Sequence, residues 1–303
     1  MEFGEFKLPR AYLIPIYRKA GDSYVEIPNR RAIVGEDGKI YDIVSDRYEL
    51  VLHETVVNTV RKILRDLNLN YEEKIKVSFD GSFMVAKYLI NTVEISKGLI
   101  DVENNETIHK EYADILRLGF VVTNSYNRTS GINITGYVFR LACKNGLVVR
   151  EDIFGRKFRH YSFVATANYE ELRKSITTVI EEINKIPELI QFAMKETVSP
   201  LDVVHFIETE FKNVVRLKRI LYRKLSSELN VDFDYWVVVY KGLKGTKESK
   251  RKEIIEKIDV PEVNLWDTIN VMTELITHNP LDEKVRYDLS KRVSKLLAKV
   301  REG

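Results

Sequence analysis

The chain has 303 residues, of which 44% are hydrophobic and 31% are charged. This composition excludes a disordered or collagen-like chain, and the length suffices for one large domain or two ordinary ones with a buried core. The 48 lysines and arginines exceed the 45 aspartates and glutamates by a formal charge of +3, which neither requires nor excludes a nucleic-acid partner.

The cysteine content and the N-terminus indicate the compartment. Cys143 is the only cysteine, which excludes an intramolecular disulfide and a cysteine-type zinc site. The first residues are acidic rather than basic, and no apolar run approaches the roughly 20 residues of a spanning helix. We therefore expect a cytoplasmic protein without membrane contact. Gln191 is the only glutamine while Lys, Glu, Arg, Ile and Val are plentiful, a bias typical of hyperthermophiles.

Short apolar runs between turn signals predict that the first half is rich in strands. A strand at 11–17 is expected at a sheet edge because it contains Pro15. A helix is expected over 56–67 from the spacing of its apolar residues. Asp80-Gly81 predicts a turn between two strands. The predicted strands, in chain order, span 11–17, 40–44, 74–89 (as a hairpin), 116–122, 132–142, 147–149 and 154–163.

After residue 165 the pattern becomes helical. One helix is expected to begin at Asn168 and to end or kink at Pro187, and another to begin at Ser199-Pro200. Asn264 and Asn279 are expected to begin two more, while 234–240 fits either a strand or a buried helix. The interpretation is an α+β fold, with a strand-rich N-terminal half carrying one or two helices and a helical C-terminal half packed on it. We place the boundary between 1–165 and 166–303.

Catalytic motifs are absent from the sequence. No histidine pair has the spacing of a metal-binding helix, and there is no nucleophile elbow or phosphate-binding loop. The acidic pair Glu151-Asp152 could bind a metal but also fits a solvated turn. We therefore assign no catalytic residue, metal or cofactor, and an enzyme is the less favoured interpretation.

Positive charge is concentrated around residues 140–160. Basic side chains alternate there with aromatic ones, a pattern that fits contact with phosphates and bases. The same alternation also fits an amphipathic strand that buries its rings and solvates its charges. The candidate binding residues in this segment are Arg140, Lys144, Arg150, Arg156, Lys157, Arg159 and His160.

A second basic feature has helical spacing. Lys212, Arg216, Arg219 and Arg223 are separated by four, three and four residues, which places them on one narrow stripe of a helix. Such a stripe fits either a solvated helix face or a surface that binds an anionic partner.

Several short motifs resemble a known family. They are Asn124-Ser-Tyr-Asn127, the Arg140-x-x-Cys143-x-Asn145-Gly146 segment and the pair Arg159-His160 before a long helix. In this order, over roughly 40–185, they resemble a family of phage- and plasmid-borne proteins of unknown function. The resemblance implies a mobile-element setting, in which DNA-binding replication and recombination proteins are common. We expect Cys143 to be buried and Asn145 or Gly146 to adopt a positive φ.

The sequence thus favours a nucleic-acid-binding protein of a virus or plasmid. We expect it to bind or anneal single-stranded DNA in replication or recombination, with a homo-oligomer as a further expectation. One alternative is a metal-dependent nucleic-acid-processing enzyme that uses Glu151, Asp152 and His160. The other is a viral structural or interaction protein that binds no nucleic acid.

Overall fold

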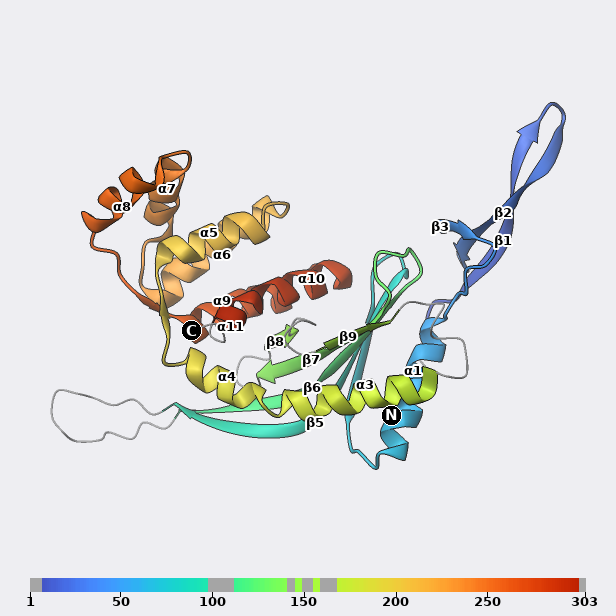
Figure 1. Ribbon diagram of the computed structural model, residues 1–303, viewed down its shortest axis with the longest axis horizontal. Coiled ribbons are helices and arrows are strands. Elements are labelled where there is room, and N and C mark those ends of the chain that lie inside the picture. The colour runs from blue at the N-terminus through green and yellow to red at the C-terminus, as the bar shows by residue number, and fades with distance from the viewer. Residues whose placement is uncertain (1–6, 98–111, 141–144, 149–154, 159–167, 300–303) are drawn as a thin grey trace.

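A computed structural model describes residues 7–97, 112–140, 145–148, 155–158 and 168–299. A central twisted sheet is flanked by helices, a further group of helices lies to one side, and an N-terminal hairpin projects from the opposite end (Figure 1). The strands are concentrated in the first half and the helices in the second, which confirms the expected α+β class.

The central sheet is antiparallel throughout. Its strand order is β4-β5-β6-β7-β8, and β9 also pairs with β7. Because side chains alternate along a strand, the apolar residues of β5 divide between the two faces, with Met84 and Tyr88 on one and Val85 and Leu89 on the other. Both faces therefore need a covering layer. The strands are β4 (Glu72–Val77), β5 (Phe83–Lys97), β6 (Tyr112–Ser125), β7 (Ile132–Arg140), β8 (Asn145–Val148) and β9 (Gly155–Phe158).

The first face is covered by helices from both halves of the chain, α1 (His53–Asp66), α3 (Asn168–Ile183) and α4 (Ile186–Ala193). Buried apolar residues at helical spacing, such as Ile176 and Val179, confirm the stripe that predicted α3. Helix α3 ends at Ile183, and Pro187 lies in the first turn of α4, so the helix ends before this proline as expected.

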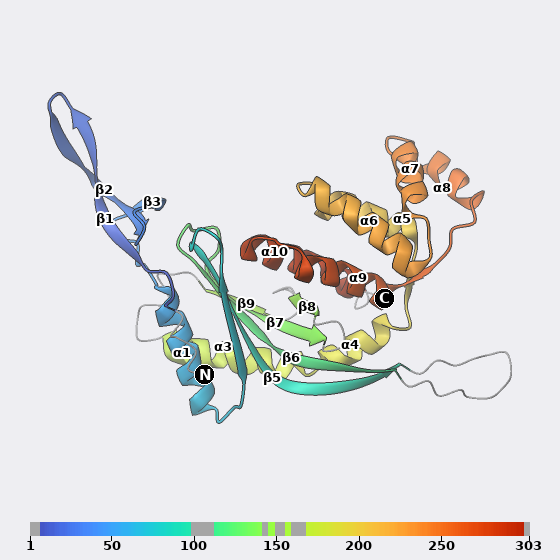
Figure 2. The same ribbon diagram turned by 180° about the vertical axis from the view of Figure 1, so that it is seen from behind.

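The second face is covered by α9 (Leu265–His278) and α10 (Glu283–Val293). Helices that follow residue 165 therefore pack on opposite faces of one sheet, seen from both sides in Figures 1 and 2. A single apolar core connects the strands with these helices. We predict that a fragment ending near residue 165 aggregates or fails to fold, because it lacks most of the helices that cover the sheet.

Of the remaining helices, α6 packs on α9 away from the sheet, and α7 packs on α5 and α6 (Figure 2). The short α11 instead contacts α10 and α4. Segment 234–240 is helical, and Ser199 and Asn264 cap α5 and α9 as expected. Asn279 instead ends α9, and Asp282 caps α10 because its carboxylate accepts the Lys284 backbone N–H. No helix in the described ranges is long and apolar enough to cross a bilayer. These elements are α5 (Pro200–Glu210), α6 (Val215–Leu229), α7 (Phe233–Leu243), α8 (Glu248–Glu256), α11 (Lys295–Lys299) and the paired strands β10 (Thr197–Val198) and β11 (Val263–Asn264).

The N-terminal arm comprises β1 (Ala11–Ala20), β2 (Ser23–Gly35) and β3 (Ile40–Ser45), paired in that order. The outer part of the β1–β2 hairpin projects away from the rest of the molecule (Figure 2). The edge position predicted for the strand with Pro15 is confirmed. The pairing register breaks beside Pro15, where residues 27–30 of β2 form a bulge that includes Pro28.

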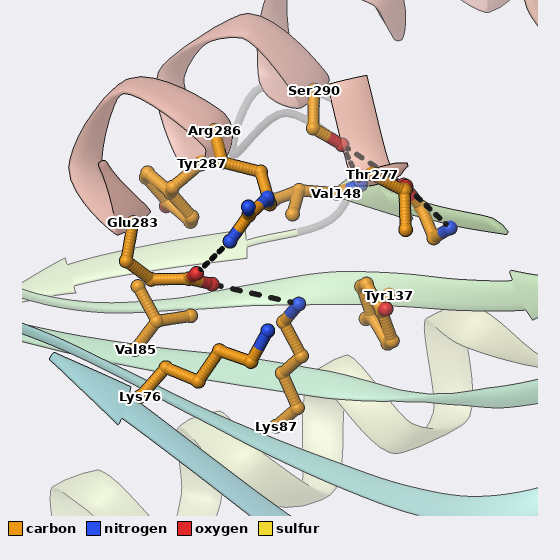
Figure 3. Close-up of a pocket in the computed structure, with 11 residues that line it drawn as sticks. Lys76, Val85, Lys87, Tyr137, Val148, Thr277, Glu283, Arg286, Tyr287 and Ser290 are labelled. Carbon is orange, nitrogen blue, oxygen red and sulfur yellow. Dashed lines mark hydrogen bonds and ion pairs between the residues drawn. The ribbon is translucent and has the colours of Figure 1, made fainter. Parts of the chain in front are cut away.

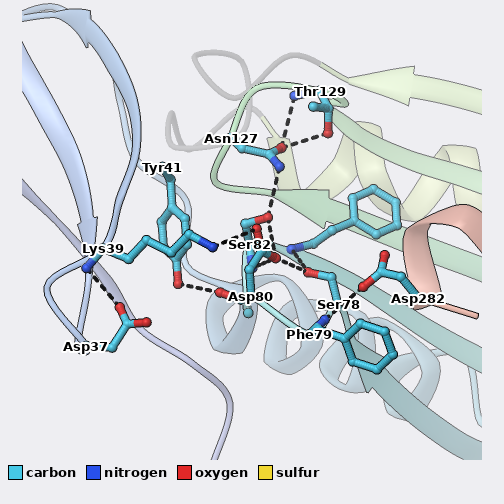
Figure 4. A network of polar contacts seen from close by, with 12 residues as sticks. Asp37, Lys39, Tyr41, Ser78, Phe79, Asp80, Ser82, Asn127, Thr129 and Asp282 are labelled. Atoms are coloured by element: carbon cyan, nitrogen blue, oxygen red, sulfur yellow. Dashed lines mark hydrogen bonds and ion pairs between the residues drawn. The ribbon is translucent and has the colours of Figure 1, made fainter.

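A turn between β4 and β5 anchors the base of the arm (Figure 4). The Asp80 carboxylate accepts hydrogen bonds from the Ser78 hydroxyl and from the backbone N–H and hydroxyl of Ser82. From the arm, the Tyr41 hydroxyl donates to the Asp80 carbonyl over 2.9 Å, and the Lys39 ammonium lies 3.7 Å from the carboxylate. Gly81 adopts a φ of 72°, which confirms the predicted Asp-Gly turn.

A second anchor lies next to this turn. The His53 ring stacks on Tyr126 at 3.8 Å between ring centroids, and the Tyr126 hydroxyl donates to the Pro9 carbonyl. The Asn124 amide contacts the His53 Nδ1 over 3.0 Å, and the His53 Nε2 contacts the Gly81 carbonyl over 3.2 Å. The Asn124-Ser-Tyr segment, which carries part of the family resemblance, is therefore buried structure.

The expectation of a positive φ at Asn145 or Gly146 is wrong. Both residues are extended in β8, opposite Arg140 and Phe139 of β7. The glycine is required for space, since a Cβ at position 146 would lie 2.0 Å from the Tyr137 hydroxyl. Cys143 lies outside the described residues.

Gly119 of β6 lies where this strand closely approaches β5. A Cβ at this position would lie 1.9 Å from the Tyr88 carbonyl oxygen, a backbone atom that cannot move without disturbing the sheet. We expect Gly119→Ala to lower the free energy of unfolding by at least about 2 kcal/mol in chemical denaturation. Gly242→Ala is the matched control, because its Cβ meets nothing within 4 Å and should raise that free energy by up to about 1 kcal/mol. Equal stability of the two variants would contradict the close approach.

Candidate functional site

The predicted basic stripe lies mostly on α6 and faces solvent. Arg216, Arg219 and Arg223 are exposed on this helix, within an arc of about 60°. They make no ion pair with any residue in the described ranges. Lys212 is also exposed but precedes the helix, because the chain turns after α5 at the buried Phe211. The expectation that all four residues share one helix is therefore wrong for Lys212.

Helix α6 is buried on one side only, which leaves the arginine stripe on its other side exposed. Its opposite side buries Leu217, Leu221 and Leu225. The two lysines that flank the stripe are neutralised, since Lys218 lies 2.7 Å from the Glu208 carboxylate and Lys224 lies 2.8 Å from the carboxylate of Glu274. Within the part of the chain that the structure describes, the three arginines are thus left as unpaired positive charge on the surface.

The basic segment 140–160 is only partly described. Arg140 is the last residue of β7 and is half-buried. The backbone of Arg156 and Lys157 belongs to β9, opposite Ile134 and Asn133 of β7. Lys144, Arg150, Arg159 and His160, together with Glu151 and Asp152, lie outside the described residues.

The described parts of the two basic features do not form one cluster. Helix α6 packs on α9, and α9 packs on β8, which pairs with β7. A layer of helix therefore separates the α6 stripe from the strands that carry Arg140, Arg156 and Lys157 (Figure 1).

The arm presents a third surface, which sequence reasoning missed. Tyr17 and Tyr24 are 55% and 72% exposed near the tip of the hairpin. Lys19 lies directly opposite Tyr24, and Glu26 directly opposite Tyr17, so these four residues share one face. Arg18 projects from the other face. The signal was present as alternating aromatic and basic residues around the Gly21 turn, but exposure became evident only in the fold.

A cluster of charged residues lies between the second face of the sheet and α10 (Figure 3). Alternation places Lys76 of β4 and Lys87 of β5 on that face. The Glu283 carboxylate of α10 lies 3.7 Å from the Lys87 ammonium and also pairs with the Arg286 guanidinium. Glu283 is 4% exposed, so this ion-pair group is buried against the sheet.

Burial is the main cause of the pKa shifts of Lys87 and Tyr137. Burial lowers the pKa of Lys87, and the nearby Glu283 carboxylate opposes that shift. Burial also raises the pKa of Tyr137, whose ring lies 5.0 Å from the Lys87 ammonium. The tyrosine hydroxyl therefore keeps its proton across the ordinary pH range.

The described part of the chain holds no group of three or more His, Cys, Asp or Glu residues arranged to bind a metal ion. The ligand set suggested by Glu151, Asp152 and His160 is outside these residues, so the metal-dependent alternative remains a hypothesis.

Residues 41–299 match a protein family described as a domain of unknown function, DUF932. The chain belongs to this family. The DUF932 match extends beyond the segment 40–185 of the resemblance and includes the helical C-terminal half. It begins at Tyr41, so β1 and β2 precede it. No curated protein and no solved structure matches the chain.

Lys87 gives a prediction about pH. Its pKa is below that of an unfolded lysine, about 10.4, so the folded protein releases this proton first as pH rises. The free energy of unfolding of the wild type should therefore increase relative to that of Lys87→Met between the folded and unfolded pKa values. The gain is about 1.4 kcal/mol for each unit by which the pKa is lowered.

Chemical denaturation over a pH series, in a buffer without phosphate, measures this difference. Lys257→Met removes an exposed lysine and serves as the control for loss of one charge. A difference between wild type and Lys87→Met that stays constant with pH would show that the Lys87 ammonium is well solvated.

Proposed function

We propose that this protein binds nucleic acid, with single-stranded DNA as the favoured form. The observation that carries the proposal is the exposed stripe of Arg216, Arg219 and Arg223 on α6, with Lys212 beside it. Nucleic-acid affinity arises largely from basic side chains that neutralise phosphates.

Repulsion among the three arginines of the stripe favours an anionic partner. Like charges three or four residues apart on a helix destabilise it by a few tenths of a kcal/mol per pair. The neighbouring Lys218 and Lys224 avoid such a cost through Glu208 and Glu274. A phosphate backbone lying along α6 would supply the compensation that the three arginines lack among the described residues.

The exposed tyrosines of the arm favour binding of single-stranded DNA over duplex DNA. Tyr17 and Tyr24 occupy diagonal positions on one face of the hairpin, a spacing of about 7–8 Å between backbones. Exposed aromatic rings stack on unpaired bases, which a duplex does not offer, and Lys19 between them adds a phosphate contact.

The proposed biological role is supported by the family resemblance rather than by the arginine stripe or the arm. The resemblance to phage- and plasmid-borne proteins supports a role in the replication or recombination of a mobile element, with annealing of single strands as the step. The exposed side chains of the projecting arm also support assembly into a homo-oligomer.

The stripe gives the first functional prediction. Replacing Arg216, Arg219 and Arg223 by Gln removes up to three phosphate contacts. For single strands each contact contributes about 0.7 to the slope of log affinity against log salt, so the slope should flatten by about 2. Fluorescence anisotropy with a labelled oligonucleotide over a salt series measures it.

The matched control replaces Lys185, Lys195 and Lys257 by Gln, which makes the same change in net charge at exposed sites elsewhere. The corresponding change at Arg156, Lys157 and Arg159 tests the 140–160 segment. If the parent binds neither single-stranded nor duplex DNA nor RNA, the proposal is wrong and the structural or interaction protein leads. Cleavage in Mg²⁺ or Mn²⁺ would favour the enzyme.

The arm gives a separate prediction. Tyr17→Ala with Tyr24→Ala should weaken single-stranded DNA binding by about 1–3 kcal/mol for each base that is stacked, while leaving the salt slope unchanged. The variant with Phe at both positions keeps the rings and should bind like the wild type. Unchanged affinity of the alanine variant would remove the arm from the binding surface.

A further inference from the structure

A cavity of about 40 Å³ lies between the second face of the sheet and α10 (Figure 3). It exceeds the roughly 10–15 Å³ needed to hold one water molecule. Lys76, Lys87 and Tyr137 line it from the sheet, and Glu283 and Arg286 line it from α10. The cavity thus offers room for a small polyatomic group in a strongly charged setting.

Lys87 brings donors that the chain does not use. An ammonium carries three N–H donors, and the side chain is only 18% exposed. Its contact with Glu283 is 3.7 Å long, which exceeds a hydrogen bond. The described residues supply no closer acceptor.

Tyr137 adds another unused donor. The residue is 4% exposed, and its hydroxyl has no hydrogen-bond partner among the residues that the structure describes. The absent side chain at Gly146 leaves the space that this hydroxyl occupies. A ligand oxygen that accepts a hydrogen bond from this hydroxyl would give it a partner.

The charge of the cavity is unbalanced. Lys76 lies exposed at its mouth and forms no ion pair within the described ranges, whereas Lys74 on the same strand lies 2.8 Å from the Glu72 carboxylate. Three cations, Lys76, Lys87 and Arg286, therefore surround the single carboxylate of Glu283. An anion would offset the excess.

Two polar groups that line the cavity on the α10 side, Ser290 and Arg286, already have hydrogen-bond partners. The Ser290 hydroxyl accepts the Val148 backbone N–H over 2.8 Å, and the Arg286 guanidinium donates to the carbonyls of Ile276 and Asn279. These contacts hold Ser290 and Arg286 in place at the wall of the cavity, which Lys76, Lys87 and Tyr137 line from the sheet.

We propose that this cavity binds a phosphate group, either free phosphate or the terminal phosphate of a nucleotide. Lys87, Lys76 and the Tyr137 hydroxyl donate to its oxygens. Glu283 accepts a hydrogen bond from the P–OH group of the ligand, which free phosphate keeps near neutral pH and a terminal nucleotide phosphate keeps below about pH 6. Sulfate carries no such proton, so the same carboxylate repels it, and the cavity discriminates between the two anions.

This site goes beyond the proposed DNA-binding surface. It lies on the sheet side of α9 and α10, whereas the α6 stripe lies on the far side of α9. Phosphate binding is measured without DNA, so either proposal can fail while the other stands.

The test is thermal unfolding and titration calorimetry of the full chain with inorganic phosphate, against sulfate at equal ionic strength. We expect phosphate well above its dissociation constant to raise Tm by a few degrees and sulfate to have little effect. Tyr137→Phe keeps the ring and should weaken phosphate binding about tenfold. Tyr235→Phe, at an exposed site on α7, is the control that should bind normally.

Two further variants separate the contributions. Lys87→Met should abolish phosphate binding, and Glu283→Gln should remove the preference for phosphate over sulfate. If phosphate and sulfate shift the Tm of wild type and Tyr137→Phe equally, the cavity holds only water and the proposal is overturned. This comparison decides the matter even if the buried-charge variants fail to fold.

A competition experiment identifies the source of the phosphate group. A 5′-phosphorylated dinucleotide that displaces inorganic phosphate, while the unphosphorylated form does not, assigns the site to a nucleic-acid terminus. Phosphate binding without such competition assigns it to the free anion.

Discussion

The buried contact between His53 and Tyr126 joins the arm, the first helix and the sheet at one point. The Tyr126 hydroxyl accepts the His53 backbone N–H and donates to Pro9, while the His53 ring contacts Asn124 and the Gly81 carbonyl. A carbonyl at Nε2 and an amide N–H at Nδ1 fit a neutral ring that is protonated on Nε2. The outer arm is almost wholly exposed, so its position depends on this contact and on the adjacent Asp80 turn.

The second organising constraint is a sheet that is covered on both faces by helices distant in sequence. Lysines on an exposed sheet face would be ordinary, but α10 covers this one and confines the Lys87 ammonium with one buried carboxylate. A buried ion group of this kind gives little net stability, because removing charges from water offsets their attraction. The outer helices, by contrast, leave the arginines of α6 in water. The same chain therefore holds positive charge in two states, solvated on α6 and confined beneath α10.

Local patterns in the sequence predicted most of the elements, because their signals are local. Apolar spacing identified α1 and α3, Pro187 indicated an interruption after α3, Ser199-Pro200 marked the start of α5, and Asp80-Gly81 marked a hairpin. The charged cavity could not be predicted in this way. Lys87 and Glu283 are 196 positions apart, and only the packing of α10 makes them neighbours. Gly146 was misinterpreted for a similar reason, since the space it leaves is filled by a residue on the adjacent strand.

The bulge in the arm has a consequence for solubility. A long hairpin that projects into water offers backbone donors and acceptors along its open edges, and other chains can extend such edges into fibrils. Pro15 removes an N–H from β1, and Pro28 lies where β2 departs from regular pairing. An incoming strand would meet an interrupted ladder flanked by Arg18 and Lys19. The arm can thus be long and exposed without acting as a template for aggregation.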